Sequence, residues 1–314
     1  MTICLDMMGG DFAPLEAVKG IRDYLTEADN PALLFLVGDE AQINPLLQQH
    51  QIPADKVRVF HAPQVIEYNE SPTKALKEKQ QSSIAVGFHL LASGKAGAFI
   101  SAGNTGAMLV GAMYSIKPIE GVQRPTISTI IPKDNGTTGL LLDVGLNADC
   151  KPEHLSQFAL LGSLYAQHIL GIEQPRVALL NIGEEEGKGN LLAQAAYPLL
   201  KENGQINFIG NVEGRDVLLS TADVIVCDGF TGNVILKMAE SFYEITHRKE
   251  VKNEYLDRFN FELYGGTPVL GVAKPVIIGH GISHAKAFSN MIHLAQKMIA
   301  TDLMEKMKSS FESK

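Results

Sequence analysis

Short apolar runs alternate with segments of helical periodicity along the whole chain, and turns rich in Gly, Asp and Asn separate them. This alternation is typical of a parallel β-sheet covered by helices. Several runs are apolar at every position, as expected of strands buried on both faces. We therefore predict an α/β fold with a mainly parallel sheet, whose strands lie at residues 3–5, 33–37, 57–60, 98–100, 127–131, 140–144, 177–182, 224–227 and 276–278.

The chain shows no low-complexity linker, no internal repeat and no break in composition. Its 314 residues, 45% of them apolar, are enough to form a full hydrophobic core. We therefore expect a single α/β domain over residues 1–314. Ser71-Pro72 indicates the start of a helix that runs towards Leu91, and a second helix is predicted over residues 152–171.

Charge and cysteine content exclude several classes of protein. With 27 Lys and Arg against 35 Asp and Glu, the formal net charge is −8, which argues against a chain that coats nucleic acid or an anionic membrane. Cys4, Cys150 and Cys227 are odd in number and widely spaced, so neither a disulfide framework nor a cysteine zinc site is expected. The N-terminus lacks the basic start of a secretory signal, and no apolar stretch has the length of a spanning helix. We expect a cytoplasmic protein without a nucleic-acid partner.

Loops rich in Gly, Asn and Asp follow most of the predicted strands. The carboxyl ends of parallel strands meet at one edge of a sheet, where open α/β sheets bind ligands. Gly lets the backbone approach a ligand closely, and the N–H groups that open the next helix attract anions. Turn formation is the alternative for any single loop, but their number favours a phosphate-bearing substrate. The loops lie at residues 6–11, 38–39, 101–106, 143–147, 181–184, 228–233 and 279–281.

The loop around Lys188 comes close to two nucleotide-binding motifs without matching either. The dinucleotide fingerprint fails because Leu192 stands where Gly or Ala is needed. The P-loop fails because Gly189 replaces the Ser or Thr that binds magnesium. Lys188 nevertheless lies in a Gly-rich turn between a strand and a helix, well placed to hold an anion as a mobile point charge. A solvated loop lysine is the alternative.

Residues 281–285 follow a strand and resemble a nucleophile elbow, but Ala285 replaces the final Gly. The acid and histidine that a serine triad needs do not follow in the required order, so no triad is expected. His280 and His284 lack the Glu of H-E-x-x-H, and we expect no metal site. His284 is expected to pack or to form hydrogen bonds, whereas His280, between two glycines, is a functional candidate.

Five ordered blocks distinguish this chain from a generic α/β protein: LDMMGGDFAP at 5–14, SAGNTGA at 101–107, EGVQRP at 120–125, VALLNIGEEEGKGN at 177–190 and VCDGFTGN at 226–233. Together they resemble the bacterial phosphate acyltransferases of phospholipid synthesis, the PlsX family. The resemblance runs from residue 3 to about residue 295. It implies a three-layer αβα sandwich with a mainly parallel sheet, related to phosphotransacetylases and to the isocitrate dehydrogenase-like fold.

The resemblance also implies a reaction in the cytoplasm. A long-chain acyl group passes reversibly from acyl-[acyl carrier protein] to inorganic phosphate, giving acyl phosphate for phospholipid synthesis. A homodimer is implied, with no cofactor and no metal, and with a membrane glycerol-3-phosphate acyltransferase as downstream partner. Two alternatives stay open: a short-chain phosphotransacetylase that uses acyl-CoA, and a non-catalytic sensor of phosphate or an acyl ligand.

The chemistry of this reaction fits the side chains available. Phosphate is already a charged nucleophile, and a thiol with a pKa near 8.5 leaves without much protonation, so positioning and oxyanion donors suffice. We hypothesise that Lys188 balances the phosphate charge and that Asn233 or His280 polarises the acyl carbonyl. The expected phosphate-binding residues are Gly10, Asn104, Thr105 and Gly106.

An acidic carrier protein should dock on the few basic clusters of this acidic chain. A solvated helix face is the alternative for Lys74, Lys77 and Lys79. The candidates are Lys74, Lys77, Lys79, Arg248, Lys249 and Lys252.

The segment 237–263 is shorter here than is usual in the family, and we expect a short helical protrusion there. Its apolar side chains could form one face, so peripheral contact with the inner face of the membrane stays open. They are Phe242, Ile245, Tyr255, Leu256 and Phe259.

The dimer interface is expected either in the helical segment after Asn233 or on the C-terminal helix. The C-terminal helix carries an apolar stripe, for which an intramolecular core is the alternative. The stripe consists of Phe288, Ile292, Ala295 and Ile299.

Overall fold

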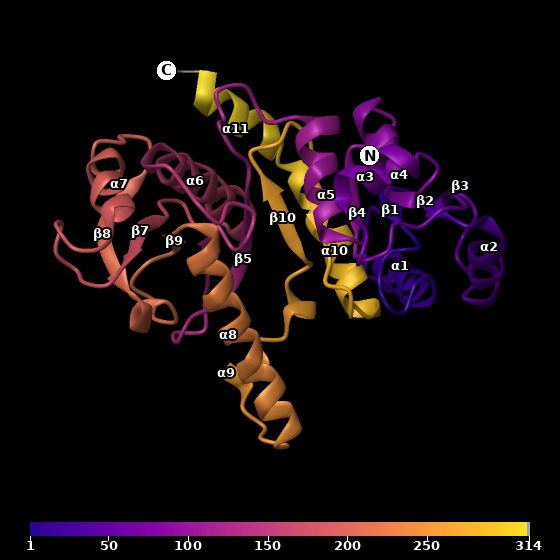
Figure 1. The fold of residues 1–314 in the computed structure, drawn as a ribbon. Helices are drawn as coiled ribbons and strands as arrows, with labels where there is room; N and C mark the ends of the chain where they lie inside the picture. The colour runs from indigo at the N-terminus through magenta and orange to yellow at the C-terminus, as the bar shows by residue number, and fades with distance from the viewer. Residues whose placement is uncertain (313–314) are drawn as a thin grey trace. The chain divides into compact units, whose positions relative to one another are not determined.

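The computed structural model describes residues 1–312, which form two compact units (Figure 1). The first unit comprises Met1–Ile119 and Phe261–Met304, and the second comprises Glu120–Asn260 with the residues from Glu305 onward. Each unit has a mainly parallel sheet, helices on both faces and a buried core. A single folding domain over residues 1–314 stays a prediction.

The sheet of the first unit has β1 in its interior. Ile3, Cys4 and Leu5 of this strand are fully buried, as a strand covered on both faces requires. All of the strands run parallel except β10, which pairs antiparallel with β11. In spatial order they are β3 (Val57–His61), β2 (Leu33–Gly38), β1 (Thr2–Asp6), β4 (Ala98–Ser101), β11 (Val276–Ile278) and β10 (Thr267–Leu270).

Helices cover both faces of this sheet (Figure 1). One face carries α1 (Leu15–Glu27), α2 (Glu40–Gln49) and α10 (Ala285–Ala300). The other carries α3 (Pro72–Glu78), α4 (Ser83–Ala92), and α5 (Thr105–Gly111) with the π-helical turn η1 (Ala112–Ile116). The short turn η4 (Phe261–Leu263) precedes β10, and α11 (Leu303–Glu312) follows α10.

The helix predicted from Ser71 towards Leu91 starts as expected but is wrong as one continuous helix, because α3 and α4 are separate. The N–H of Ser83 donates to the carbonyl of Gln64 at 3.2 Å, which pulls the chain out of the helical path. Ser82 then caps α4, since its hydroxyl accepts from the N–H of Ala85 at 3.2 Å. A pairing with a distant segment therefore overrides the local helical pattern.

Helices α1 and α10 pack closely within the first unit. A Cβ on Gly20 would lie 2.5 Å from the Cβ of Phe288, so only glycine permits this approach. Phe288, Ile292 and Ala295 are buried. The intramolecular alternative for the stripe on α10 is thus confirmed for these three residues, and they are not available for a dimer interface.

The sheet of the second unit has one antiparallel edge strand, β5, next to β6. The remaining strands run parallel to β6. In spatial order they are β5 (Thr126–Pro132), β6 (Thr138–Leu142), β9 (Val224–Val226), β7 (Arg176–Asn181) and β8 (Asn207–Glu213). Its helical elements are α6 (Pro152–Tyr165), the π-helical turn η2 (Ala166–Leu170), α7 (Leu191–Lys201), the 3-10 turn η3 (Gly214–Asp216), α8 (Gly229–Arg248) and α9 (Glu254–Asp257).

All nine predicted strands are present, whereas β8 and β10 were missed. The first four residues of β8 alternate between exposed and half-buried positions, and its two buried residues include a polar one, Asn211, so no apolar run marks the strand. In β10 the second residue is Pro268, which counts against a strand in a sequence pattern. The helix predicted over 152–171 is confirmed as α6 and η2, and Gly171 ends it in the left-handed conformation.

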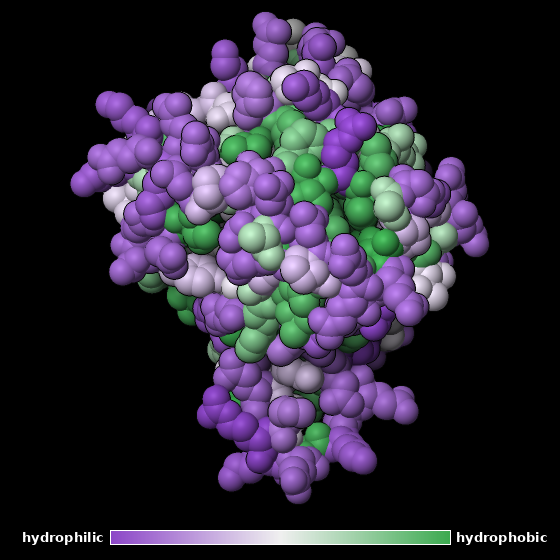
Figure 2. Space-filling model, turned by 90° about the vertical axis from the view of Figure 1, so that its right-hand side faces the viewer, coloured by the Kyte–Doolittle hydropathy of each residue, from purple (hydrophilic) through white to green (hydrophobic). Residues whose placement is uncertain are grey.

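Helices α8 and α9 project from the sheet of the second unit, where a short protrusion was expected (Figure 1). Phe259 is buried, and its ring meets those of Phe242 at 5.7 Å and Tyr255 at 5.6 Å. Most of the side chains of the expected apolar face therefore pack against one another inside the protrusion, while Ile245 stays 55% exposed. Figure 2 shows a mainly hydrophilic surface on this part of the molecule. Within residues 1–312 no helix combines the length and the apolar character needed to cross a bilayer.

Lys133, which follows β5, is a buried lysine in the second unit, 2% exposed. Its ammonium group donates to the carbonyl of Val217 at 2.8 Å. Burial lowers the pKa of Lys133 to about 8, and the nearby carboxylates of Asp223 and Asp134 offset only part of this effect. The native state thus holds the Lys133 proton less tightly than the unfolded chain does.

We predict that this lysine makes stability rise with pH. Unfolding takes up a proton between pH 8 and pH 10, so the free energy of unfolding of the wild type relative to Lys133→Met should increase by about 2 kcal/mol over that interval. Urea denaturation of both proteins at the two pH values measures it. The exposed Lys252, changed to Met, serves as control, and a difference that does not vary with pH would contradict the prediction.

Candidate functional site

Three loops meet at the carboxyl ends of β1, β4 and β11 in the first unit. The N–H of Asp11 donates to the carbonyl of Gly281 at 2.8 Å, which joins the first loop to the third. The N–H of Gly279 donates to the carbonyl of Ser101 at 2.8 Å, which joins the third to the second. The glycine-rich loops that the sequence placed at a common edge are therefore in direct contact here.

Asp6 holds the base of these loops. Its carboxyl group is buried and accepts hydrogen bonds from the hydroxyl of Ser101 at 2.6 Å and from the N–H of Met8 at 2.9 Å. Burial raises the pKa of Asp6, while these hydrogen bonds act in the opposite direction. The carboxyl group thus fixes the loop after β1 to the end of β4.

Asn104 is buried, 4% exposed, and its side chain is fully engaged. Its oxygen caps α5 by accepting from the N–H of Ala107 at 2.9 Å. Its nitrogen donates to the carbonyl of Glu67 at 2.8 Å and to that of Glu70 at 3.3 Å. Asn104 therefore shapes the loop, and the groups left for an anion are backbone N–H donors such as those of Thr105 and Gly106.

A small cavity of about 60 Å³ lies under these loops. This volume is enough for about four water molecules. Gly10, which lines the cavity, is at φ +107°, a conformation that favours glycine. The lining includes Asp6, Gly9, Gly10, Tyr68, Ser83 and Gly103.

Tyr68 was not a candidate from sequence, because it is distant in the chain from the three glycine-rich loops and lies in a segment without a motif. Its hydroxyl donates to the carbonyl of Ala102 at 3.1 Å, and the residue lines the cavity. Burial of the hydroxyl raises the pKa of Tyr68 to about 12, with Asp11 adding to the effect. Asp6 and Ser83 were missed too, although a carboxylate directly after a buried apolar run was a usable signal for Asp6.

His280 lies at the exposed rim of the same loops. Its ring is tilted against that of Phe261, with centroids 4.9 Å apart. The nearby hydroxyl of Ser283 is buried and donates to the carbonyl of His280 at 2.6 Å, which gives Ser283 a structural part in the turn. His284 stacks on Phe12, with centroids 4.5 Å apart, which confirms the expectation that it packs.

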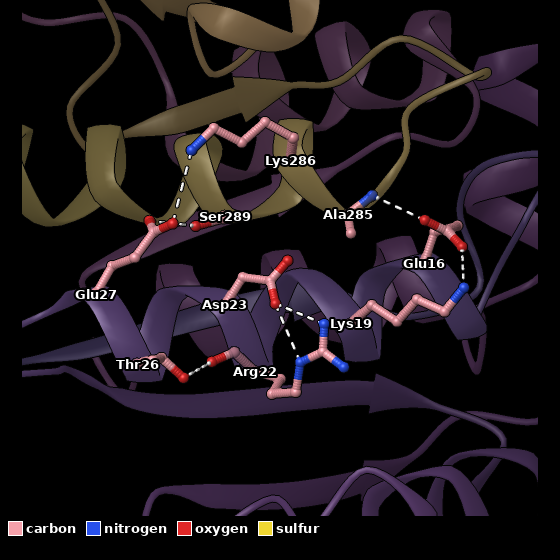
Figure 3. Close-up of polar contacts among 9 residues, drawn as sticks. All are labelled: Glu16, Lys19, Arg22, Asp23, Thr26, Glu27, Ala285, Lys286 and Ser289. Carbon is pink, nitrogen blue, oxygen red and sulfur yellow. Dashed lines mark hydrogen bonds and ion pairs between the residues drawn. The ribbon is translucent and has the colours of Figure 1, made fainter.

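The first turns of α10, the helix that follows this rim, are anchored to both ends of α1 (Figure 3). Glu16 accepts a hydrogen bond from the N–H of Ala285, the first residue of α10, at 2.9 Å. Glu27 accepts one from the hydroxyl of Ser289 at 3.3 Å. The segment of His280 and Ile282 is thus held between β11 and a fixed helix.

In the second unit, Asp143 holds the loop after β6, as Asp6 holds the loop after β1 in the first unit. Its buried carboxyl group accepts from the N–H groups of Gly145 at 3.2 Å, Leu146 at 3.2 Å and Asn147 at 2.7 Å. The amide of Asn147 adds a side-chain bond at 2.7 Å. Burial raises the pKa of Asp143, and these bonds act against the rise.

Asn233 and Lys188 belong to the second unit, at the carboxyl ends of β9 and β7. Asn233 donates from its side-chain amide to the carbonyl of Val144 at 3.1 Å, so it braces the loop after β6. Lys188 is exposed, and its carbonyl accepts from the amide of Asn181 at 3.0 Å. Its ammonium group makes no ion pair within residues 1–312, whereas the neighbouring Glu186 pairs with Lys201 at 3.0 Å. Lys188 thus presents an uncompensated positive charge.

The candidate docking residues differ in how much charge they offer. The ammonium group of Lys79 lies 2.6 Å from the carboxylate of Glu70 and 2.7 Å from the carbonyl of Val65. Its charge is therefore already paired within the first unit. Arg248 pairs with Glu244 at 3.1 Å on an exposed helix face. The other candidates are exposed and make no ion pair in the described part of the chain: Lys74, Lys77, Lys249 and Lys252.

The site residues predicted from sequence thus fall into two sets. One set shares the carboxyl edge of the first sheet: Gly10, Asn104, Thr105, Gly106 and His280. The other set, Lys188 and Asn233, belongs to the second unit. Across residues 1–312 no cluster of three His, Cys, Asp or Glu side chains has a geometry that could hold a metal ion.

We predict that the loop after β6 depends on Asp143. Asp143→Ala removes a buried carboxyl group that accepts from the buried N–H of Asn147 and from the part-buried N–H groups of Gly145 and Leu146, which should cost about 3–5 kcal/mol of unfolding free energy. Urea denaturation measures the loss, and amide hydrogen exchange should accelerate at Gly145, Leu146 and Asn147. Asp149→Ala, an exposed change in the same loop, should stay within about 0.5 kcal/mol. Equal stability of the two variants would contradict this role.

Comparison with known proteins places the chain in a family. A family model described as a fatty acid synthesis protein matches residues 1–306. A phosphate acyltransferase from Dictyoglomus turgidum is 43% identical over 325 residues, covering 98% of this chain and 96% of the relative. One from Aquifex aeolicus is 43% identical over 327 residues, covering 98% of this chain and 96% of the relative.

Solved structures confirm the expected phosphotransacetylase-like αβα fold. The EutD phosphotransacetylase from Staphylococcus aureus is similar with a TM-score of 0.64 at 18% sequence identity, covering 94% of each chain. A phosphotransacetylase from Streptococcus pyogenes gives a TM-score of 0.66 at 16% identity, covering 95% of this chain and 94% of that one. The sequence relatives carry the assignment further: the chain belongs to the phosphate acyltransferase family, whose members are acyltransferase enzymes.

Proposed function

We propose that the protein transfers a long-chain acyl group from acyl-[acyl carrier protein] to inorganic phosphate, reversibly forming acyl phosphate for phospholipid synthesis. The observation that carries the proposal, beside family membership, is the glycine-lined cavity under the loops of the first unit. It combines a small volume with backbone that can approach a compact anion closely. A cytoplasmic location, with the product passed to a membrane glycerol-3-phosphate acyltransferase, belongs to the same proposal.

The reaction needs positioning more than activation. A phosphate oxygen attacks the thioester carbonyl, the C–O bond forms, and the C–S bond breaks as the thiolate leaves and takes a proton from solvent. Phosphate is charged at neutral pH, and a thiol of pKa about 8.5 is an adequate leaving group. The protein therefore has to fix the reactants and stabilise the oxyanion of the tetrahedral intermediate.

The catalytic and phosphate-binding candidates other than Asn104, which shapes its loop, each have a part in this scheme. Thr105 and Gly106 offer backbone donors to phosphate, and Gly10 lets the loop approach it. Lys188 balances the phosphate charge. Asn233 or His280 polarises the acyl carbonyl, and for Asn233 this uses the N–H that does not bond Val144.

We further propose that α8 contributes to a homodimer. Phe230, Val234 and Met238 are spaced four residues apart on one helix face and are 67%, 54% and 61% exposed. A face of this kind is costly to leave in water, and a second copy of the chain covers it in our proposal. Val234→Lys should shift sedimentation from dimer to monomer, whereas Lys249→Glu should not. A monomeric wild type would end this proposal.

One assay tests the function against its alternatives. Long-chain acyl-carrier protein, long-chain acyl-CoA and acetyl-CoA are each supplied with phosphate, and acyl phosphate is measured. The proposal expects turnover with the carrier-linked donor at the highest kcat/KM. Preference for acetyl-CoA would identify a short-chain phosphotransacetylase, and binding of phosphate without any product would identify a sensor.

The phosphate requirement should depend on Lys188. Lys188→Ala removes the uncompensated charge, so the KM for phosphate should rise about tenfold, equivalent to about 1.4 kcal/mol, while the KM for the acyl donor changes less than about twofold. Steady-state kinetics with varied phosphate measures both. Lys201→Ala, an exposed lysine already paired with Glu186, is the matched control. An unchanged KM for phosphate would remove Lys188 from the site.

Docking of the acidic carrier should depend on salt. Raising ionic strength from about 0.01 to about 0.15 M shortens the screening length from roughly 30 to 8 Å, so the KM for acyl-carrier protein should rise several-fold. The double variant Lys74→Glu with Lys77→Glu should show a higher KM at low salt and a flatter salt profile. Lys95→Glu, an exposed lysine of the same unit, serves as control. A flat profile for the wild type would count against electrostatic docking.

A further inference from the structure

Three large apolar side chains that are partly exposed lie on segments next to the polar cavity of the first unit. Phe12 is 43% exposed, Tyr68 is 53% exposed and Ile282 is 45% exposed. Each comes from a segment that borders the cavity or its loops: the loop after β1, the segment before α3 and the loop after β11. Single exposed apolar residues are ordinary on protein surfaces, but three on adjoining segments around one polar cavity form a pattern that needs an explanation.

Contacts on the backbone bring these segments together. The N–H of Asp11, next to Phe12, donates to the carbonyl of Gly281, next to Ile282, at 2.8 Å. The hydroxyl of Tyr68 lies 2.8 Å from the position that a Cβ on Gly281 would occupy. The segments that carry the three apolar side chains are therefore in contact with one another, next to the cavity that Tyr68 lines.

The apolar side chains are also held in place. The ring of Phe12 stacks on that of His284 with an interplanar angle of 18°. The hydroxyl of Tyr68 is fixed on the carbonyl of Ala102 at 3.1 Å. Ile282 precedes α10, whose first N–H is bound by Glu16 (Figure 3). A ligand that covers these side chains would thus meet a surface that loses little conformational freedom on binding.

We propose that Phe12, Tyr68 and Ile282 form the binding surface for the part of the acyl chain next to the reacting carbonyl. This inference rests on the proposed function. An acyl phosphate has a compact anionic end joined directly to an uncharged hydrocarbon chain. A site for it requires anion donors and an apolar surface side by side, and the first unit presents both within adjoining loops. Burial of the first few methylene groups on this surface would favour longer chains over acetyl.

The test compares chain lengths. Phe12→Ser and Ile282→Ser, alone and together, are assayed for kcat/KM with butyryl, octanoyl and palmitoyl donors on the same carrier at fixed phosphate. We expect the double variant to lose about tenfold in kcat/KM with palmitoyl and less than about twofold with butyryl, because only long chains lose apolar contact. Tyr114→Ser is the matched control, since Tyr114 is 74% exposed in η1 at the other end of the α5 helix. It should leave all three donors unchanged.

A second measurement separates this inference from the function on which it rests. Binding of hexadecylphosphonate and butylphosphonate to the unreacted protein is measured by calorimetry, without turnover. Tighter binding of the long compound by the wild type, lost in the double variant, supports the apolar surface even where no acyl phosphate forms. Equal losses for both compounds, or no loss for either, would overturn it. A wild type that binds hexadecylphosphonate in this way but produces no acyl phosphate from any donor would instead overturn the proposed function.

Discussion

A buried carboxyl group at the end of a strand sets the geometry of each unit. Asp6 follows the apolar run of β1, and Asp143 follows that of β6. A carboxyl group that folding removes from water must find hydrogen-bond donors, and here they come from the loop that follows the strand and from a second strand, at Ser101 for Asp6 and at Ile127 for Asp143. The loops therefore close around the carboxyl group, and their shape is a consequence of satisfying it. The same arrangement, used once in each unit, places glycine-rich backbone at the carboxyl edge of each sheet.

This constraint decides which groups remain for chemistry. Asn104 and Lys79 are polar side chains that the sequence analysis marked as candidates, yet both are engaged in contacts within the first unit. Engagement of this kind makes the loops rigid, which is what catalysis by positioning requires. What remains available is backbone N–H in the first unit and the exposed ammonium group of Lys188 in the second. The chemistry proposed for the family relies on such groups and needs no enzyme nucleophile.

In the protrusion, too, most of the side chains that the sequence marked as candidates are engaged within the molecule. Its aromatic residues Phe242, Tyr255 and Phe259 form a core of their own, because a helix that leaves the sheet has no other apolar surface to pack on. The apolar side chains left exposed lie instead along the first turns of α8, at Phe230, Val234 and Met238. The dimer that we propose uses these side chains, two of which follow Asn233, in one of the two segments where the sequence analysis expected the interface.

The sequence by itself determined the α/β class, nine of the strands, the glycine-rich loops and the family, because each depends on local periodicity or on contiguous blocks of residues. Only the tertiary structure decided what the side chains in those loops do. The partner of Asp6 is Ser101, 95 residues away, and that of Asn104 is Glu67, 37 residues away. No local pattern encodes such pairs. The same reason applies to the place of Tyr68 in the cavity lining, to the break between α3 and α4, and to the contact between the segments of Phe12 and Ile282. Each depends on segments that only the folded chain brings side by side.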